Sequence, residues 1–300
     1  MNNTDSTILI FGHKGQVGWE LRRTLAPLGN IISAGVDGAD HELDITDQQA
    51  LAELAHELRP ALMVNATAYT AVDQAESEPE LAFKVNAEAV GAIGHLGAAL
   101  DCPVLHYSTD YVFSGDTQTP WDIEDEPAPQ SIYGQSKLAG EKALIDSRAD
   151  HLILRTAWVY GQRGKNFLLT MLRLFAEKEQ VSVVADQFGA PTWSRLIAEA
   201  TAQMLIQCKE PSGRFVFGRK SGLYHLTAQG QASWYDFAAL ILEHSGLDCQ
   251  LKAITSADYP TPAPRPAYSV LDNSLAHDVF GVQLPPWEKG LALCLEEMQG

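Results

Sequence analysis

The sequence has few cysteines, and they are scattered. Cys102, Cys208, Cys249 and Cys294 form no C-x-x-C pair and have no histidine nearby at metal-ligand spacing. Structural zinc sites and disulfide frameworks both require clustered ligands. We therefore expect four reduced thiols, a reducing compartment and no zinc site.

Long apolar runs are also missing. No stretch approaches the roughly 18 consecutive apolar residues that a membrane-spanning helix requires. Residues 1–6 are polar, and the apolar run at 7–11 ends at Gly12 without the basic start and long apolar core of a secretory signal. The sequence predicts a cytoplasmic protein with no leader and no membrane partner.

The sequence has fewer basic than acidic residues. The chain has 21 Lys and Arg against 38 Asp and Glu, a net charge of −17, and its pI is about 4.8. Such a charge repels phosphate backbones and anionic lipid, which excludes nucleic acid as an expected partner. Hydrophobic residues make up 46% of the 300 residues, so a core needs no disulfide, and the length suggests about two domains.

Short apolar runs alternate with amphipathic segments in the first half of the chain. This alternation is typical of βαβ units. The expected strands are 8–11, 31–36, 62–65, 104–108 and 152–155, and the expected helices lie near 17–28, 47–59, 79–100 and 133–147. We predict an α/β fold with a doubly wound parallel sheet, a Rossmann domain, over residues 1–155.

The pattern loosens after about residue 156. Helical stretches near 166–178, 193–209, 233–245 and 287–298 are separated by loops rich in Pro and Gly, of which 259–266 is the richest. Proline cannot donate a backbone hydrogen bond, so that loop is expected to be irregular and to form a surface segment or a cleft wall. Residues 156–300 are predicted to be a smaller α/β substrate-binding lobe, with some segments returning to the Rossmann sheet.

A glycine-rich turn follows the first strand. Gly12, Gly15 and Gly18 have the spacing G-x-x-G-x-x-G and enclose His13, Gln16 and Val17. Glycines at a strand-to-helix turn let the backbone approach a pyrophosphate, and the helix N-terminus supplies free N–H donors. The spacing departs from G-x-G-x-x-G, but its place after the first strand favours a dinucleotide site.

The choice between the two nicotinamide cofactors is weakly set by the sequence. An acidic residue about 20 positions beyond the glycines would bind the adenosine ribose and favour NADH. Asp37 is a candidate, although the strand could equally end at Gly35, and Asp44 more plausibly flanks the adenine. Lys14 and Arg22 or Arg23 are placed to reach a 2′-phosphate, so we expect use of either NADPH or NADH.

Three residues have the spacing of a proton-transfer site. Tyr133 and Lys137 lie one turn apart on a predicted helix, and Thr109 follows a predicted parallel strand, at whose carboxyl end ligands bind. An ammonium near a phenol favours the phenolate and lowers its pKa. Tyr133 is therefore the expected general acid/base, and Thr109 is expected to orient a carbonyl oxygen. A Tyr-x-x-x-Lys pair alone is common on helix surfaces, but here it occurs together with the glycine turn.

These residues resemble the extended short-chain dehydrogenase/reductase family, which joins such a glycine turn to Tyr-x-x-x-Lys and an upstream Ser or Thr. Longer strings narrow the resemblance to a branch that acts on dTDP-linked sugars and cover nearly the whole chain. They are NATAYTAVDQAE at 65–76, HYSTDYVF at 106–113, YGQSKLAGE at 133–141, RTAWVY at 155–160, DQFGAPT at 186–192 and RP at 265–266.

The resemblance implies a reaction and a set of binding residues. The reaction is reduction of the C4 ketone of dTDP-4-dehydro-6-deoxy-L-mannose to dTDP-L-rhamnose with NADPH or NADH. The implied cofactor positions are the glycine-turn residues named above with Asp37, Asp44, Ile45, Ala66, Thr67, Ala68, Tyr69, Asn86, Tyr133 and Lys137. The implied substrate positions are Val72, Thr109, Asp110, Tyr111, Trp158 and Arg265.

One departure from the resemblance concerns metal. Some relatives use acidic residues after Gly-Ala-Pro-Thr, with a glutamate of the first helix, to bind Mg²⁺ between subunits. Glu20 is present here, but Arg195 stands in the segment after Thr192 and would repel a cation. We expect no metal, and a homodimer remains possible without one.

Other functions of the same fold remain as alternatives. A dehydratase needs an additional acid after the strand-end Thr-Asp, where this chain has Tyr111. An epimerase recycles a tightly bound cofactor, whereas a reductase consumes it. A non-catalytic regulatory subunit would have no chemical reason to retain Thr109, Tyr133 and Lys137.

Overall fold

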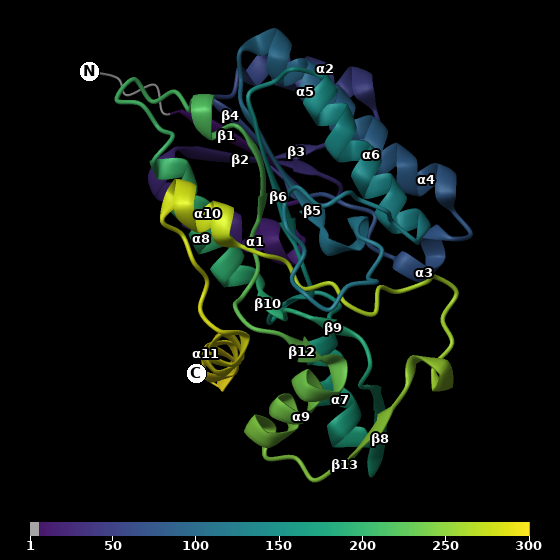
Figure 1. Cartoon of the computed structure of the whole chain (residues 1–300). Coiled ribbons are helices and arrows are strands. Elements are labelled where there is room, and N and C mark those ends of the chain that lie inside the picture. The colour runs from purple at the N-terminus through teal and green to yellow at the C-terminus, as the bar shows by residue number, and fades with distance from the viewer. Residues whose placement is uncertain (1–5, 300) are drawn as a thin grey trace.

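The computed structural model describes residues 6–299, and the polar residues 1–5 that entered the leader prediction lie outside this range. The chain folds into two lobes, a larger one around a parallel sheet and a smaller one below it in Figure 1. Within the described residues, no helix has the length and apolar character needed to cross a membrane.

A seven-stranded parallel sheet forms the larger lobe. Its order is β11-β6-β5-β4-β1-β2-β3, so strand order reverses at β1, where a doubly wound fold places its ligand. The strands are β1 Thr7–Phe11, β2 Asn30–Gly35, β3 His41–Glu42, β4 Leu62–Asn65, β5 Val104–Thr109, β6 His151–Thr156 and β11 Gly222–His225. The predicted α/β fold class and all five predicted strands are confirmed.

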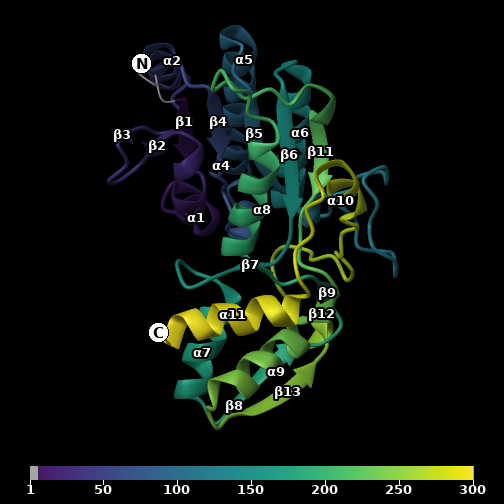
Figure 2. The same cartoon turned by 90° about the vertical axis from the view of Figure 1, so that its left-hand side faces the viewer.

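Helices cover both faces of this sheet (Figures 1 and 2). Along β1, Ile8 and Ile10 pack in one core cluster, and Leu9 and Phe11 pack in another. Burial on both faces explains why this strand is continuously apolar. The first face carries α1 Gln16–Thr24, α8 Ser194–Ile206 and α10 Ser274–Phe280; the second carries α2 Gln48–Leu58, α5 Ala89–Leu100 and α6 Ile132–Asp146.

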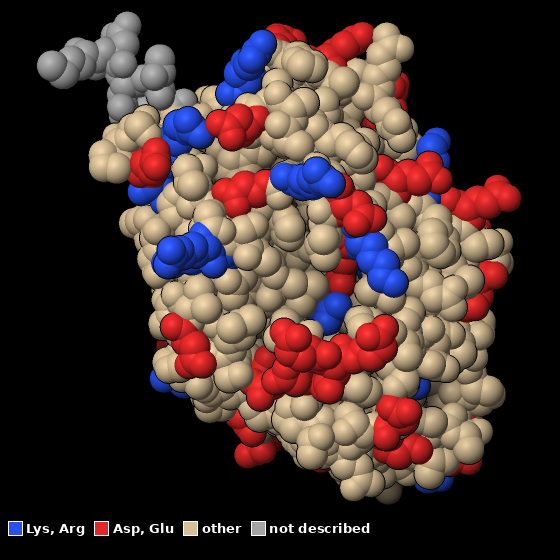
Figure 3. Space-filling model, turned by 45° about the horizontal axis from the view of Figure 1, so that its top comes forward, with Lys and Arg blue, Asp and Glu red and all other residues tan. Residues whose placement is uncertain are grey.

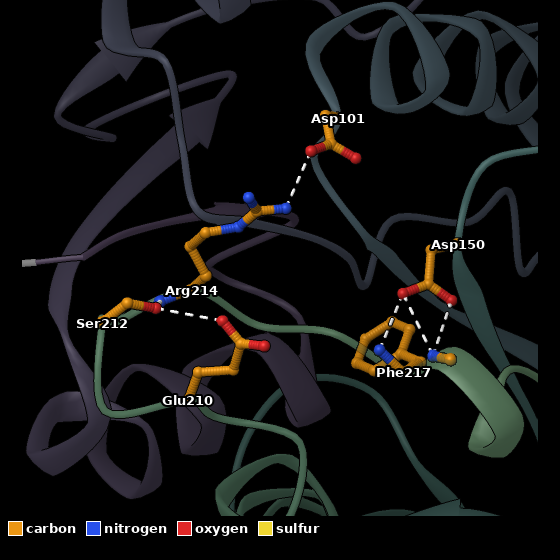
Figure 4. A network of polar contacts seen from close by, with 7 residues as sticks. Asp101, Asp150, Glu210, Ser212, Arg214 and Phe217 are labelled. Carbon is orange, nitrogen blue, oxygen red and sulfur yellow. Dashed lines mark hydrogen bonds and ion pairs between the residues drawn. The ribbon is translucent and has the colours of Figure 1, made fainter.

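The edge strand β11 comes from the second half of the chain. It pairs in parallel with β6, with His225 opposite Arg155. The segment that precedes β11 is bound near the starts of β5 and β6. Asp150, just before β6, accepts hydrogen bonds from the backbone N–H groups of Phe217 and Gly218. Arg214 pairs with Asp101, which lies before β5, at 2.7 Å (Figure 4). These contacts lie at the end of the sheet away from the predicted site.

The smaller lobe has a core of its own. Phe237 and Trp287 are buried in it and meet edge to face. Its main elements are α7 Phe167–Glu177, β8 Gln180–Val184, α9 Trp234–Ser245, β13 Gln250–Ile254 and α11 Trp287–Gln299; β8 and β13 pair in parallel. Two short ribbons, β7 Val159–Tyr160 with β10 Thr192–Trp193 and β9 Phe188–Gly189 with β12 Ala232–Ser233, lie between the lobes in Figure 1.

Acidic side chains are grouped on one face of the molecule. On the face shown in Figure 3, Asp and Glu gather in contiguous groups while Lys and Arg are more scattered. This distribution agrees with the net charge of −17.

A buried ion pair fastens α6 to the sheet. Arg155 of β6 donates from Nε and Nη2 to both carboxylate oxygens of Glu141, at 2.9 and 2.7 Å. The two side chains are 4% and 2% exposed. The guanidinium also lies over the ring of Phe113, 5.0 Å from its centroid. This pair fixes the helix on which Tyr133 and Lys137 stand.

Replacing Arg155 by Met should destabilise the fold strongly, because it leaves the Glu141 carboxylate buried without a partner. We expect the free energy of unfolding in urea to fall by about 3–5 kcal/mol. The control is Arg173→Met, which breaks an exposed pair with Glu177 and should cost about 0–1 kcal/mol. Equal effects of the two variants would contradict this account.

Candidate active site

The carboxyl ends of β1, β4 and β5 bring the predicted site residues together. The glycine turn follows β1, residues 66–69 follow β4, and Thr109 ends β5. Phe11 is the register partner of Asn65, so β1 and β4 end at the same level. Asn65 is the partner of His106, so β5 continues three residues further, to Thr109. The edge of the sheet therefore offers backbone and side-chain groups from three strands to one ligand.

The glycine turn has the geometry that a dinucleotide pyrophosphate requires. Gly12 has a φ of +84°, and a Cβ there would lie 2.7 Å from the backbone of Ala66. A Cβ at Gly18 would overlap the carbonyl of Gly12. Helix α1 starts after Gly15 without a side-chain cap, so its first N–H groups are free to bind an anion.

A cavity of about 260 Å³ adjoins this turn. Its lining combines the turn with the ends of β1 and β2: Phe11, Gly12, His13, Lys14, Gly15, Ala34, Gly35, Val36, Asp37, Leu43, Asp44, Ile45 and Thr67. His13 is 3% exposed, and its Nε2 has no hydrogen-bond partner among the described residues. The cavity, the free polar atom and the uncapped helix fit the adenosine and phosphates of a nicotinamide cofactor.

The acidic candidates lie at the rim of this cavity. Strand β2 ends at Gly35, and Asp37 follows in a left-handed conformation with a φ of +58°. Asp37 is largely exposed and lies 4.0 Å from Lys14, a distance at which an exposed pair is weak. Asp44 accepts hydrogen bonds from the backbone and hydroxyl of Thr46, which lower the pKa of its carboxyl. Both ribose-binding and 2′-phosphate-binding groups are thus available.

Two other predicted cofactor residues connect elements of the fold. Gln16 donates to the carbonyl of Val159 and accepts from Asn166 at 2.9 Å, so its amide joins the two lobes. Val17 packs against the core of the larger lobe.

Asn86 holds the loop after β4 in place. It is buried in the π-helical segment Lys84–Glu88, accepts from the N–H of Tyr69 at 2.8 Å and donates to the carbonyl of Tyr69 and to Ser136 on α6. The Tyr69 hydroxyl in turn donates to Glu78. The amide of Asn86 is fully engaged, so it fixes the loop Ala66–Ala68 against the helix that carries Tyr133.

Thr109 and Asp110 form a buried polar pair at the end of β5. The Thr109 hydroxyl donates to Asp110 Oδ1 at 3.0 Å and accepts from the N–H of Tyr111 at 3.2 Å. Burial raises the pKa of Asp110 to about 6, although the hydroxyls of Ser269 and Thr109 act against this rise. Asp110 Oδ2 has no partner among the described residues.

Tyr133 stands in the first turn of α6. Ser131 caps this helix by accepting from the N–H of Gly134, and the Tyr133 ring meets Tyr111 edge to face at 5.6 Å. Burial raises the pKa of Tyr133 to about 12, while a hydrogen bond from Thr109 lowers it. The pairing of Thr109 with Tyr133 in catalysis stays a prediction.

Lys137 is buried, and its ammonium nitrogen is directed toward β5. Nζ donates to the carbonyl of Tyr107 at 2.6 Å and lies 3.2 Å from Nε2 of His106. Among the described residues no hydrogen bond joins Lys137 to Tyr133, and Lys137 does not contribute to the raised pKa of the phenol. Strand β5 takes the hydrogen bonds of the lysine in this structure, and the lowering of the Tyr133 pKa by Lys137 stays a prediction. Burial lowers the pKa of Lys137 to about 8.

A second cavity, of about 640 Å³, lies in the smaller lobe. Arg265 forms part of its wall together with Tyr259 and Thr261 of the proline-rich loop. Arg265 pairs with Asp73 at 2.9 Å, and its Nη1 is buried without a partner among the described residues. A free guanidinium N–H at the edge of a cavity suits a phosphate oxygen.

Trp158 and Val72 lie at the junction of the lobes. Trp158 has a φ of +47° and stacks on Trp234 with a centroid distance of 3.4 Å. Val72 is half-buried at the start of α3, Val72–Ala75, the helix that also carries Asp73. Tyr111 lies near Arg265, which acts to lower its pKa against the effect of burial.

Arg195 occupies the position discussed for metal. It donates to Glu20 at 2.9 Å and to Glu297 at 2.8 Å. The guanidinium thus occupies oxygens of both carboxylates with its own hydrogen bonds and places a positive charge where a Mg²⁺ ion would have to bind.

Four residues of the site were missed in the sequence. Asn65 and His106 are polar residues inside apolar strands. This pattern could have predicted that they bond to one another or to the site, because a buried polar side chain needs a partner. Asp73 and Trp234 gave no signal, since their partners Arg265 and Trp158 are far away in the chain.

Comparison with known proteins identifies close relatives. Residues 6–300 match the family described as RmlD substrate binding domain. A dTDP-4-dehydrorhamnose reductase of Escherichia coli (strain K12) is 46% identical over 298 residues, which cover 97% of each chain.

Solved structures of dTDP-4-dehydrorhamnose reductases are also similar to this chain. A dTDP-4-dehydrorhamnose reductase from Clostridium acetobutylicum superimposes with a TM-score of 0.90 at 33% identity, covering 98% of this chain and 100% of that one. One from Bacillus anthracis, solved in complex with NADP, has a TM-score of 0.87 at 33% identity with the same coverage.

Removal of divalent cations should leave this protein unchanged, because the positive charge of Arg195 already lies between Glu20 and Glu297 and is bonded to both. We expect the sedimentation profile and the thermal unfolding midpoint to be the same after exhaustive EDTA treatment as in the presence of Mg²⁺. An oligomer that dissociates in EDTA and re-forms on addition of Mg²⁺ alone would contradict the prediction.

Proposed function

The chain belongs to the dTDP-4-dehydrorhamnose reductase family, and we propose that it reduces the C4 ketone of dTDP-4-dehydro-6-deoxy-L-mannose to give dTDP-L-rhamnose. The observation that carries this proposal is the position of Thr109 at the end of β5, the strand to which Lys137 bonds from α6, the helix that also carries Tyr133. The predicted family is confirmed by relatives that match the whole chain.

Tyr133 is the proposed proton donor. When bound, NADPH or NADH supplies the hydride that adds to C4. The carbonyl oxygen then gains negative charge, and Tyr133 gives it the phenolic proton as general acid. The raised pKa of the phenol keeps this proton in place at neutral pH before the reaction.

Thr109 and Asp110 position the ketone. The Thr109 hydroxyl is close to the Tyr133 phenol and can donate to the same carbonyl oxygen, where charge develops. That hydroxyl now donates to Asp110, so it must turn from Asp110 to the substrate. A buried carboxyl with an unpartnered oxygen is well suited to accept a sugar hydroxyl.

The second cavity supports a nucleoside diphosphate as the remainder of the substrate. Arg265 offers its unpartnered Nη1 to a diphosphate oxygen, while Asp73 holds the guanidinium in place. The Trp158 ring, fixed by its stacking on Trp234, offers an apolar face to the sugar. Val72 and Tyr111 complete the expected substrate contacts.

Further parts of the proposal follow from the same features. We assign residues 1–155 to the dinucleotide-binding domain and residues 156–300 mainly to the substrate lobe, with β11 contributed to the Rossmann sheet. A cytoplasmic location is supported by four free cysteine thiols. Glycine-turn, β2-end and β4-end residues are proposed to bind the cofactor.

The direct test is oxidation of NADPH and of NADH by the purified protein with dTDP-4-dehydro-6-deoxy-L-mannose. We expect one cofactor to be consumed per sugar reduced, and little activity with the corresponding UDP and GDP sugars. Turnover without net cofactor consumption would indicate an epimerase instead. Binding of cofactor without turnover of any of these sugars would favour a regulatory subunit.

Replacing Tyr133 by Phe removes the proton donor and retains the ring that packs against Tyr111. Turnover should fall by roughly 10²–10⁴, with little change in the Kd for NADPH. A matched control is Tyr235→Phe, which removes a phenol on α9 of the other lobe and should leave turnover unchanged. Near-normal turnover in Tyr133→Phe would refute the assigned role.

A further inference from the structure

Two buried residues that the reaction does not use connect Lys137 to the sheet. Asn65 and His106 are register partners on β4 and β5, and they are 1% and 0% exposed. Asn65 Nδ2 lies 3.1 Å from His106 Nδ1, and His106 Nε2 lies 3.2 Å from Lys137 Nζ. These contacts form a continuous chain, which we call the Asn65–His106–Lys137 relay.

The direction of the relay is fixed at Asn65. The backbone N–H of Thr67 donates to Asn65 Oδ1 at 3.0 Å. Because a backbone N–H can only donate, this contact identifies the amide oxygen and leaves the NH₂ group facing His106. His106 Nδ1 must therefore accept, and the proton of the neutral imidazole resides on Nε2.

This tautomer places a donor against Lys137. An ammonium has three donors and no lone pair, so it cannot accept from the Nε2–H of His106. A neutral amine can accept from His106 and still donate to the carbonyl of Tyr107 at 2.6 Å. The opposite tautomer would turn an N–H of the ring toward the NH₂ group of Asn65. Only the neutral amine satisfies every contact of the relay.

We propose that Asn65 and His106 are positioning residues that favour the neutral amine of Lys137 and hold it against β5. Burial keeps the pKa of His106 well below its usual value, although the backbone of Asn65 acts against this, and the low pKa agrees with a neutral ring. On α6 itself, Glu141 favours the ammonium, but its carboxylate is already bonded to Arg155 of β6.

The other titratable groups of the site do not supply a partner to Lys137. Tyr133 lies one turn earlier on α6, and Asp110 follows β5 with its carboxylate toward Thr109. The Tyr107 phenol is directed to Thr201 on the other face of the sheet.

The consequence for catalysis rests on the proposed function. A neutral amine does not stabilise an ionised phenol, whereas an ammonium does. By lowering the pKa of Lys137, the relay therefore opposes the activation of Tyr133 as the pH rises through about 8. The protonation state of Lys137 itself does not depend on which sugar is reduced.

The test uses the full-length protein without cofactor, labelled with ¹⁵N-histidine and with ¹³Cε-lysine for NMR. Lys137→Met and His106→Gln assign the two signals. We expect the His106 proton on Nε2, with no titration between about pH 6 and 9, and Lys137 titrating near pH 8, against about 10.4 for an ordinary lysine. A proton on Nδ1, or an ordinary titration of Lys137, would overturn the proposal.

Two substitutions then separate the tautomer from charge. In Asn65→Asp the carboxylate still accepts from Thr67 and also accepts from a proton on Nδ1 of His106, so it favours the opposite tautomer of the ring. In Asn65→Ala the donor to His106 Nδ1 is removed and no charge is added. The Lys137 pKa should rise by about one unit or more in Asn65→Asp and by a smaller, measurable amount in Asn65→Ala. If the pKa of Lys137 rises in Asn65→Asp but not in Asn65→Ala, the added charge explains the effect and the proposal is overturned.

Circular dichroism of both variants checks that the fold is retained, and the wild-type tautomer decides the question if Asn65→Ala does not fold. No cofactor or sugar enters these measurements. A protein that fails to reduce the dTDP-sugar can therefore still show the relay, and an active reductase can still lack it.

Discussion

Parallel pairing of β1, β4 and β5 is the constraint on which the rest of this structure depends. Parallel strands end on the same edge of a sheet, and here the reversal of strand order at β1 opens that edge to a ligand. The turn at Gly12 can then press against Ala66, and Thr109 reaches the same edge. Most of the proposed cofactor contacts start from one of these strand ends or from the helix and loop that follow it, and the others follow β2 and β3.

Burying polar groups in this sheet has a cost, and hydrogen bonds offset it. Arg155 and Glu141 are both almost inaccessible and satisfy one another through two bonds. Lys137 is equally buried but has no carboxylate bonded to it, so its nitrogen turns to a carbonyl and an imidazole of β5. The same helix thus carries one charge held by an ion pair and one group whose charge depends on its surroundings.

The smaller lobe completes the site with residues that no local pattern connects. Arg265 follows a proline-rich loop, yet it is held by Asp73 from the larger lobe. Trp158 takes a left-handed backbone conformation and is fixed by Trp234 of α9. The proposed substrate positions therefore depend on contacts between segments up to about two hundred residues apart, and the glycine turn also packs against Ala66, which follows β4.

The sequence by itself determined the fold class, the five strands and the place of the glycine turn, because alternation of apolar runs and turn residues is a local property. It also identified Thr109, Tyr133 and Lys137 as a set, since their spacing follows from strand and helix geometry. Only the tertiary structure decided that β11 joins the sheet, that β2 ends at Gly35, and that Lys137 faces His106 rather than Tyr133. Those outcomes depend on register between strands and on competition for hydrogen bonds in the interior, and neither is encoded in the spacing of residues along one segment.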